Sequence, residues 1–284
     1  MTGGFARKEA RAGLLFVLPV LALFVLVNST PVAISFIYSL TDFTLGTEAN
    51  FVGLANYKFL ISDTEFLRAL IVTLKMGLGL ALPGSLIGFL IALAISKGSR
   101  TGIFSTILFI PVIYPSVVSA FIWGATLKGD GLLNRYLGLD IDWLNKISTA
   151  LPSLILVLLW TNIGFYVVIM LTGLRGITPS LYEAASLDGA NEWQKLRWIT
   201  FPVMKPVILF VGIIATSDAL QIFTQPYLIT GGGPAESTKV LAGLVYEVLF
   251  ERLQIGIASA IAVSLALMSS LIAFIQFSLV RSRR

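Results

Sequence analysis

Long apolar runs alternate with shorter polar segments along almost the whole chain. A transmembrane helix needs about 20 mostly apolar residues, and each of these runs is long enough to provide one. They do not show the alternating ten-residue segments of a membrane β-barrel. We therefore predict an all-α polytopic membrane protein, with one transmembrane domain over residues 1–284 and six helical spans. The predicted spans are residues 12–38, 66–96, 103–127, 150–173, 203–228 and 254–280.

The first run follows a short basic arm, as the apolar core of a signal peptide would. It is too long for that core and lacks a cleavage site of small residues. We therefore expect residues 12–38 to be retained as a span.

The composition agrees with this prediction and excludes several kinds of site chemistry. Hydrophobic residues make up 56% of the chain, charged residues only 12%, and the mean hydropathy is +0.90. A soluble domain would carry about 25% charged residues. The chain contains no cysteine and no histidine. Disulfides, thiol metal sites and histidine proton relays are therefore excluded, and ion-coupled transport and catalysis are less favoured.

The net charge of +5 is unevenly placed. Twelve of the 20 Lys and Arg residues fall on one side of the predicted topology. By the positive-inside rule this side, with both chain termini, is cytoplasmic, and no nucleic-acid partner is needed to explain the charge. The twelve are Arg7, Lys8, Arg11, Lys97, Arg100, Arg175, Lys195, Arg197, Lys205, Arg281, Arg283 and Arg284.

The predicted cytoplasmic loop, residues 174–202, contains residues typical of the start and the end of a short helix. Thr178 and Pro179 favour a helix start, and Ser180 with Glu183 offers an overlapping capping box. Gly189 favours the end of this helix, because glycine readily adopts the left-handed conformation found there.

A second helix is predicted directly afterwards. Asn191 can cap the segment "EWQKLRWIT", and we expect this helix to stop before Pro202.

The first helix of the loop has a mostly apolar surface on a water-facing segment. Leu181, Tyr182 and Leu187 can fill a hydrophobic groove, while Ala184 and Ala185 allow a close approach to the backbone. Such a surface fits a protein partner. It fits equally a helix lying on the bilayer.

Polar residues inside the fourth and fifth spans are candidates for a substrate pathway. Asp218, Gln221 and Gln225 are spaced i, i+3, i+7, which predicts one helical face, with Ile222 on the same side. In the fourth span Phe165 and Tyr166 follow Asn162 by three and four residues, which again predicts one face, with Trp160 and Thr161 beside it. Amides, carboxylates and aromatic faces suit a neutral sugar. Asp218 and Asn162 are equally compatible with structural roles between helices.

The segment "EAASLDGANEWQKLRWITFP" resembles the EAA loop of the membrane subunits of binding-protein-dependent ABC importers. The matching positions are Glu183, Ala184, Ala185, Asp188, Gly189, Ala190, Trp193, Ile199 and Pro202, while Phe201 replaces the usual Leu. Four further segments resemble the carbohydrate branch related to the maltose-transporter permease. These are "FVGLANY" (51–57), "IPVIYPSVVSAFIW" (110–123), "GLLN" (131–134) and "TGGGP" (230–234).

The resemblance implies a permease subunit in a bacterial or archaeal cytoplasmic membrane. Its partners would be a second homologous permease, two ATPase subunits, an extracytoplasmic binding protein and membrane lipid. The short helix would be a coupling helix seated in an ATPase subunit, with Glu183 facing polar or basic groups and Gly189 forming the turn. Alternating access would be driven by ATP and Mg²⁺ on the ATPase subunits, with no cofactor on this chain. The chain itself has no Gly-x-x-x-x-Gly-Lys-Ser/Thr phosphate loop.

The resemblance also implies that a sugar contacts the two spans flanking the loop. The corresponding positions are Leu158, Thr161, Asn162, Phe165, Ala215, Ala219 and Ile222.

Two alternatives are weighed against a sugar importer. The first is an importer for glycerol-phosphate or another polyol; a phosphate would need Arg or Lys near the midplane of the fourth and fifth spans, where the sequence has none. An ion-coupled secondary transporter would need an internal repeat, and none is detectable. We therefore expect a transport subunit for a neutral sugar rather than an enzyme.

Overall fold

The computed structural model describes residues 3–96, 98 and 100–281, and the side chains of residues 13–96, 98 and 100–278. Helices form two compact units. One unit comprises the chain up to Ser62 together with Val245–Ser264. The other comprises Asp63–Leu244 together with the chain from Leu265 onward. Lys97, Arg283 and Arg284 lie outside the described residues, as do the side chains of Arg7, Lys8, Arg11 and Arg281.

In the first unit one continuous helix includes the residues of the first predicted span. It comprises α1 (Gly3–Phe24), the π-helical turn η1 (Val25–Ser29) and α2 (Thr30–Tyr38). Its part from Gly13 to Tyr38 is long and apolar enough to cross a membrane.

The "FVGLANY" segment enters α3 (Ala55–Ser62) and holds the end of α2. The Asn56 amide donates to the carbonyls of Ser39 (2.9 Å) and Thr41 (2.8 Å), and the Tyr57 hydroxyl lies 2.7 Å from Oγ of Ser39. The turn η4 (Glu247–Glu251) and the beginning of α13 (Ile255–Arg281) complete this unit.

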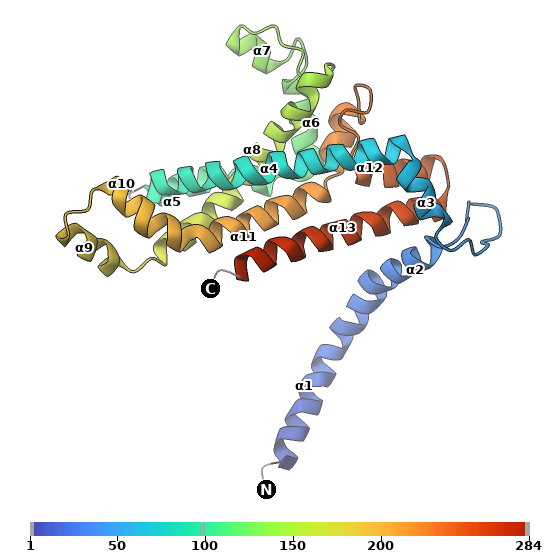
Figure 1. Cartoon of the computed structure of the whole chain (residues 1–284), viewed down its shortest axis with the longest axis horizontal. Coiled ribbons are helices and arrows are strands. Elements are labelled where there is room, and N and C mark those ends of the chain that lie inside the picture. Colours follow the sequence, from blue (N-terminus) through green and yellow to red (C-terminus); the bar gives the residue numbers. More distant parts are fainter. Residues whose placement is uncertain (1–2, 97, 99, 282–284) are drawn as a thin grey trace. The chain divides into compact units, whose positions relative to one another are not determined.

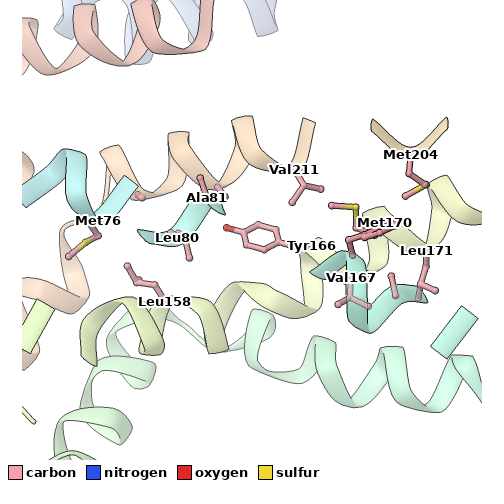
Figure 2. Packing of buried hydrophobic residues seen from close by; sticks show 14 of the residues in the cluster. Met76, Leu80, Ala81, Leu158, Tyr166, Val167, Met170, Leu171, Met204 and Val211 are labelled. Carbon is pink, nitrogen blue, oxygen red and sulfur yellow. The ribbon is translucent and has the colours of Figure 1, made fainter. Parts of the chain in front are cut away.

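The second unit is built on α4 (Thr64–Ser96), α8 (Ile147–Arg175) and α11 (Phe201–Leu220), which pack along one another (Figure 1). Their contact surfaces form the hydrophobic cluster, in which Tyr166 lies among Met76, Leu80, Ala81, Leu158 and Val211 (Figure 2). The later part of α13 also belongs to this unit, and Gln276 donates to Oγ1 of Thr216 at 3.0 Å.

Five helices are long and apolar enough to cross a membrane, or six if one bent pair counts as a span, within the part of the chain that is described. This confirms the all-α polytopic class. The second, fourth and sixth predicted spans correspond to α4, α8 and α13 within a few residues.

The third predicted span is wrong as a continuous helix. Residues 103–127 are divided into α5 (Thr101–Ile113) and α6 (Ser116–Thr126), which meet at 96°. The break falls at Tyr114–Pro115. Proline has no N–H to donate and forces the residue before it out of the helical region, and Tyr114 is extended at φ −67° and ψ 135°.

The fifth predicted span is displaced toward the N-terminus. The helix starts in α10 (Glu192–Lys195), continues through the π-helical turn η2 (Leu196–Thr200) into α11 and ends at Leu220. The predicted stop before Pro202 does not occur: the π-helical turn directly before it, where the Phe201 N–H bonds to the Leu196 carbonyl, interrupts the regular hydrogen-bond pattern and accommodates the proline within the helix.

The polar connections fold into short helices and turns. These are α7 (Leu132–Leu137), α9 (Pro179–Leu187), α12 (Leu241–Tyr246) and the turn η3 (Pro226–Thr230). The turn η3 ends at Gly231 with φ +59°, so the "TGGGP" segment begins in a turn.

Candidate functional site

The helix α9 forms within the bounds that its sequence predicts. Thr178 precedes it in an extended conformation and Pro179 is its first residue. The helix therefore contains Ser180, and the alternative start with a Ser180–Glu183 capping box is not used. At its end the Ala190 N–H donates to the Ala185 carbonyl (2.9 Å), which is the Schellman arrangement.

Gly189 makes this ending possible. Its φ of +78° lies in the left-handed region, and no atom lies within 4 Å of the position that a Cβ would take. The glycine is required by the backbone conformation and not by crowding.

One face of α9 points away from the rest of the unit. Glu183, Ala184 and Leu187 are exposed, and Leu187 is 90% exposed. Leu181 is 46% exposed at the edge of this face, followed by exposed Asp188 at the C-cap. An apolar side chain left this open on a polar loop marks a surface that a partner can cover.

The opposite face of α9 is turned inward. Tyr182 is half-buried against the hydrophobic cluster, and its hydroxyl lies 2.8 Å from Oγ1 of Thr200. Tyr182 thus contacts its own chain rather than pointing outward with Leu187. Thr200 was not found from the sequence, because its role depends on the π-helical turn that brings it beneath α9.

The next helix begins at the predicted cap. The Asn191 side chain accepts from the Gln194 N–H (2.9 Å), and the Gln194 side chain accepts from the Asn191 N–H (2.8 Å). This capping box fixes the direction of the chain between α9 and α11.

In the fourth span the predicted polar face is partly present. Thr161 and Asn162 are half-buried and Phe165 is 36% exposed. The Asn162 amide donates to the Leu158 carbonyl at 2.9 Å. Thr161 lies 3.2 Å from Oγ of Ser119 on α6, a contact that the sequence did not predict.

Tyr166 does not share this face, which corrects the prediction. It is fully buried, and its ring fills the space beside two glycines of α4. A Cβ on Gly84 would lie 2.9 Å from the Tyr166 ring, and one on Gly88 would lie 3.2 Å from its Cβ. Tyr166 is therefore a packing residue of the cluster.

The predicted face of the fifth span is also only partly formed. Asp218 and Gln221 are exposed, and Asp218 has no hydrogen bond or ion pair among the described residues. Gln225 does not belong to this face, because α11 ends at Leu220 and Gln225 is 3% exposed beyond it. Ala219 is fully buried and Ile222 half-buried, so neither extends the exposed face.

A polar network that the sequence did not predict fixes the segment after η3. Thr230 and Thr238 approach to 2.6 Å, and Thr238 donates to the Gly233 carbonyl at 2.7 Å. Lys239 then forms an ion pair with Glu65 of α4 at 2.9 Å. This loop is therefore tied to the first turn of α4.

A model of the family described as "Binding-protein-dependent transport system inner membrane component" matches residues 84–284. This match covers more than half of the chain, and the chain belongs to that family. The family resemblance and the fold class predicted from the sequence are thereby confirmed.

Two relatives are similar over nearly their whole length. The chain is 31% identical over 270 residues to the trehalose/maltose transport system permease protein MalF of Thermococcus litoralis, covering 93% of this chain and 91% of that protein. It is 30% identical over 284 residues to the lactose transport system permease protein LacF of Rhizobium radiobacter, covering 96% and 95%.

Solved structures share the fold. A bacterial ABC transporter involved in the import of the acidic polysaccharide alginate matches with a TM-score of 0.82 and 24% identity, covering 98% of each chain. A bacterial alginate ABC transporter in complex with alginate pentasaccharide-bound periplasmic protein matches with a TM-score of 0.80 and 24% identity, covering 95% and 94%. At this identity the similarity shows the fold alone.

Proposed function

We propose that the chain is the membrane-spanning permease subunit of an ATP-driven ABC importer for a sugar or oligosaccharide. The observation that carries this proposal is the family match over residues 84–284, which includes α8, α9 and α11. Its relatives are named as permeases for trehalose and maltose and for lactose. The chain is accordingly a transport subunit and not an enzyme.

The exposed face of α9 is the docking surface for an ATPase subunit in this proposal. Leu187 supplies an apolar anchor, and Glu183 supplies a carboxylate without an ion pair among the described residues. Two small residues, Ala184 and Ala185, let the partner approach the helix backbone. ATP and Mg²⁺ belong to the two ATPase subunits, and this chain holds no cofactor.

The end of the second unit that carries α9 is the cytoplasmic end, with both chain termini on the same side. Five of the twelve predicted cytoplasmic cations have described side chains. They lie in or beside the helix ends that neighbour α9, as the positive-inside rule requires: Arg100, Arg175, Lys195, Arg197 and Lys205.

A second permease subunit and an extracytoplasmic binding protein complete the importer. The first span, Gly13–Tyr38, has no buried residue, so lipid or another subunit covers it. The related alginate transporter was solved with a periplasmic protein that carries an oligosaccharide, which supports a binding protein for this chain.

Sugar passes between the two permeases along the half-buried and exposed polar residues of α8 and α11. Asn162 and Asp218 offer hydrogen-bonding groups, and Phe165 offers an aromatic face for the apolar side of a sugar ring. ATP-driven closure of the ATPase subunits moves α9 and changes which side of the membrane this path faces.

Uptake into proteoliposomes tests the proposal. The chain is reconstituted with its second permease and ATPase subunits, and the sugar-loaded binding protein is added outside with ATP enclosed. Uptake should require ATP, the ATPase subunits and the binding protein together. Uptake that persists without ATP or without the ATPase subunits would overturn the assignment.

A further inference from the structure

A cavity of about 750 Å³ lies behind α9, on the side opposite its exposed face. Its walls come from the last turns of α4 and α8, from α9 itself and from the α10–η2 segment. Tyr182 and Thr200, the pair that holds α9, both line it. No residue of the candidate sugar path lines this cavity, so it is a separate site.

The cavity lies at the level of a membrane surface. Leu93 and Ser96 belong to the end of α4, and Leu174 and Arg175 to the end of α8. Both helices are long and apolar enough to cross a membrane, and at 33 and 29 residues they exceed the thickness of the hydrocarbon, so we place these ends at its boundary or just outside it, among the headgroups. Trp193, 65% exposed at the rim, is the residue type enriched at that boundary.

The charges at the rim favour an anion. Arg175 is exposed and has no ion pair among the described residues. The Lys195 ammonium lies 3.0 Å from Glu192, and its side chain is 16% exposed. With two cations and one carboxylate, the lining has a positive balance, and the unpaired guanidinium can bind a phosphate through two hydrogen bonds.

The interior of the cavity is apolar. Leu93, Leu174 and Leu196 are partly buried. Leu174 and Leu196 pack against the hydrophobic cluster, and Ile177, which belongs to the cluster, is 5% exposed. A free phosphate or nucleotide would leave this surface uncovered, whereas a headgroup with an adjoining acyl chain matches both parts of the cavity.

We propose that this cavity binds an anionic phospholipid of the cytoplasmic leaflet, with the phosphate at Arg175 and an acyl chain against Leu93, Leu174 and Leu196. Basic pockets between transmembrane helices on the cytoplasmic side are characteristic sites for anionic headgroups. The inference rests on the proposed function only in assigning the lipid to the cytoplasmic leaflet. The lipid would support α9 from behind, because Tyr182 borders the cavity.

Native mass spectrometry of the assembled complex tests this site. The complex is released from nanodiscs of equal parts phosphatidylglycerol and phosphatidylcholine, and bound lipids and ATPase subunits are counted in the same spectra. The wild type should retain phosphatidylglycerol selectively. Arg175→Gln should reduce that retention about tenfold, as expected for one charge-assisted phosphate contact.

Two further variants make the test specific. Arg197→Gln is the matched control, because Arg197 lies over the Trp198 ring, 5.5 Å from its centroid, and does not line the cavity. It should retain the lipid. Ser96→Trp fills the cavity without changing its charge and should displace the lipid. Unchanged retention in both Arg175→Gln and Ser96→Trp would overturn the proposal.

The outcomes also separate the lipid from other occupants. If Arg175→Gln loses the ATPase subunits while it keeps the lipid, the cavity belongs to the ATPase interface and the lipid proposal is wrong. If the lipid is selectively retained at Arg175 but no ATPase subunit ever assembles, the lipid site is supported and the proposed function fails.

Discussion

The hydroxyl of Tyr182 lies 2.8 Å from the hydroxyl of Thr200, and this contact joins α9 to the buried last residue of η2, directly before α11. Tyr182 is the one residue of α9 that packs against the hydrophobic cluster. Because α11 follows directly after Thr200 and runs as far as Asp218 and Leu220, one helix connects the contact with α9 to the candidate sugar path.

Tyr182→Phe should weaken this connection without removing the ring. The net loss for one hydrogen bond is about 0.5–1.5 kcal/mol. We expect the ATPase activity stimulated by sugar-loaded binding protein to fall severalfold, while the ATPase subunits still co-purify. Thr200→Val should have the same effect, and the double variant should be no worse than either single one. Fully additive losses would show that the two hydroxyls act independently. Tyr136→Phe on α7, where Tyr136 is 83% exposed, is the control.

Leu187→Ala should weaken docking of the ATPase subunit. Burying a leucine side chain in an interface contributes about 1.5–3 kcal/mol, which corresponds to a loss of roughly 10- to 100-fold in affinity. Leu187 makes little contact with its own chain at 90% exposure, so the thermal stability of the permease should not change. Leu137→Ala on α7, at a residue 60% exposed, controls for the loss of an exposed leucine. Equal affinity of Leu187→Ala and wild type for the ATPase subunit, measured by titration in nanodiscs, would contradict the docking assignment.

Gly189→Ala should disturb the end of α9 through the backbone alone. A residue with a Cβ pays about 1–2 kcal/mol in the left-handed conformation, and the space around Gly189 is empty. We expect reduced sugar-stimulated ATPase activity, and a smaller reduction for Gly189→Asn, since asparagine tolerates this conformation. Gly124→Ala, in α6 with similarly open space, should be neutral in the same assay. An asparagine variant as impaired as the alanine variant would point to a lost partner contact instead.

Local signals explain what the sequence predicted well. The start of α9 at Thr178–Pro179, its end at Gly189 and the cap at Asn191 each depend on residues within one turn. The spans are predicted from the length and the apolar character of each run, and neither property depends on a partner helix. These features account for the all-α class and for the position of the loop.

The sequence predictions were wrong where contacts with residues distant in the sequence determine the structure. Pro83 and Pro152 lie inside uninterrupted helices, while Pro115 separates α5 from α6, so a proline alone does not predict a break. Phe165 and Tyr166 are neighbours on α8, yet only Tyr166 is buried, because Gly84 and Gly88 of α4 leave room for its ring. Neither the helix break at Pro115 nor the burial of Tyr166 can be predicted from the helical periodicity of the sequence.

Asn162→Ala and Asp218→Asn should impair sugar uptake without disturbing assembly. Asn162→Ala removes an amide, and Asp218→Asn replaces a charged acceptor of hydrogen bonds from sugar hydroxyls by a weaker, neutral one. Losing about 1 kcal/mol corresponds to a roughly fivefold rise in the KM of uptake. Thr172→Val is the control, because Thr172 is an exposed polar residue of the same helix as Asn162 and bonds only to the Val168 carbonyl in the described structure. If KM is unchanged while the maximal rate falls, the two residues have structural roles between helices.

Gly164→Ala should destabilise the permease more than any of the site variants. Gly164 of α8 lies against the backbone of α5, and a Cβ there would approach the Leu108 carbonyl oxygen to 1.9 Å. Backbone atoms cannot rotate away as a side chain can, so α5 and α8 would have to separate, at a cost of at least about 1–3 kcal/mol for overpacking. The apparent Tm in detergent should fall, together with the yield of folded protein. Gly102→Ala in α5, where no atom lies within 4 Å of the new Cβ, should leave both unchanged. A Gly164→Ala permease as stable as the wild type would mean that α5 does not pack on α8 at this distance in the membrane.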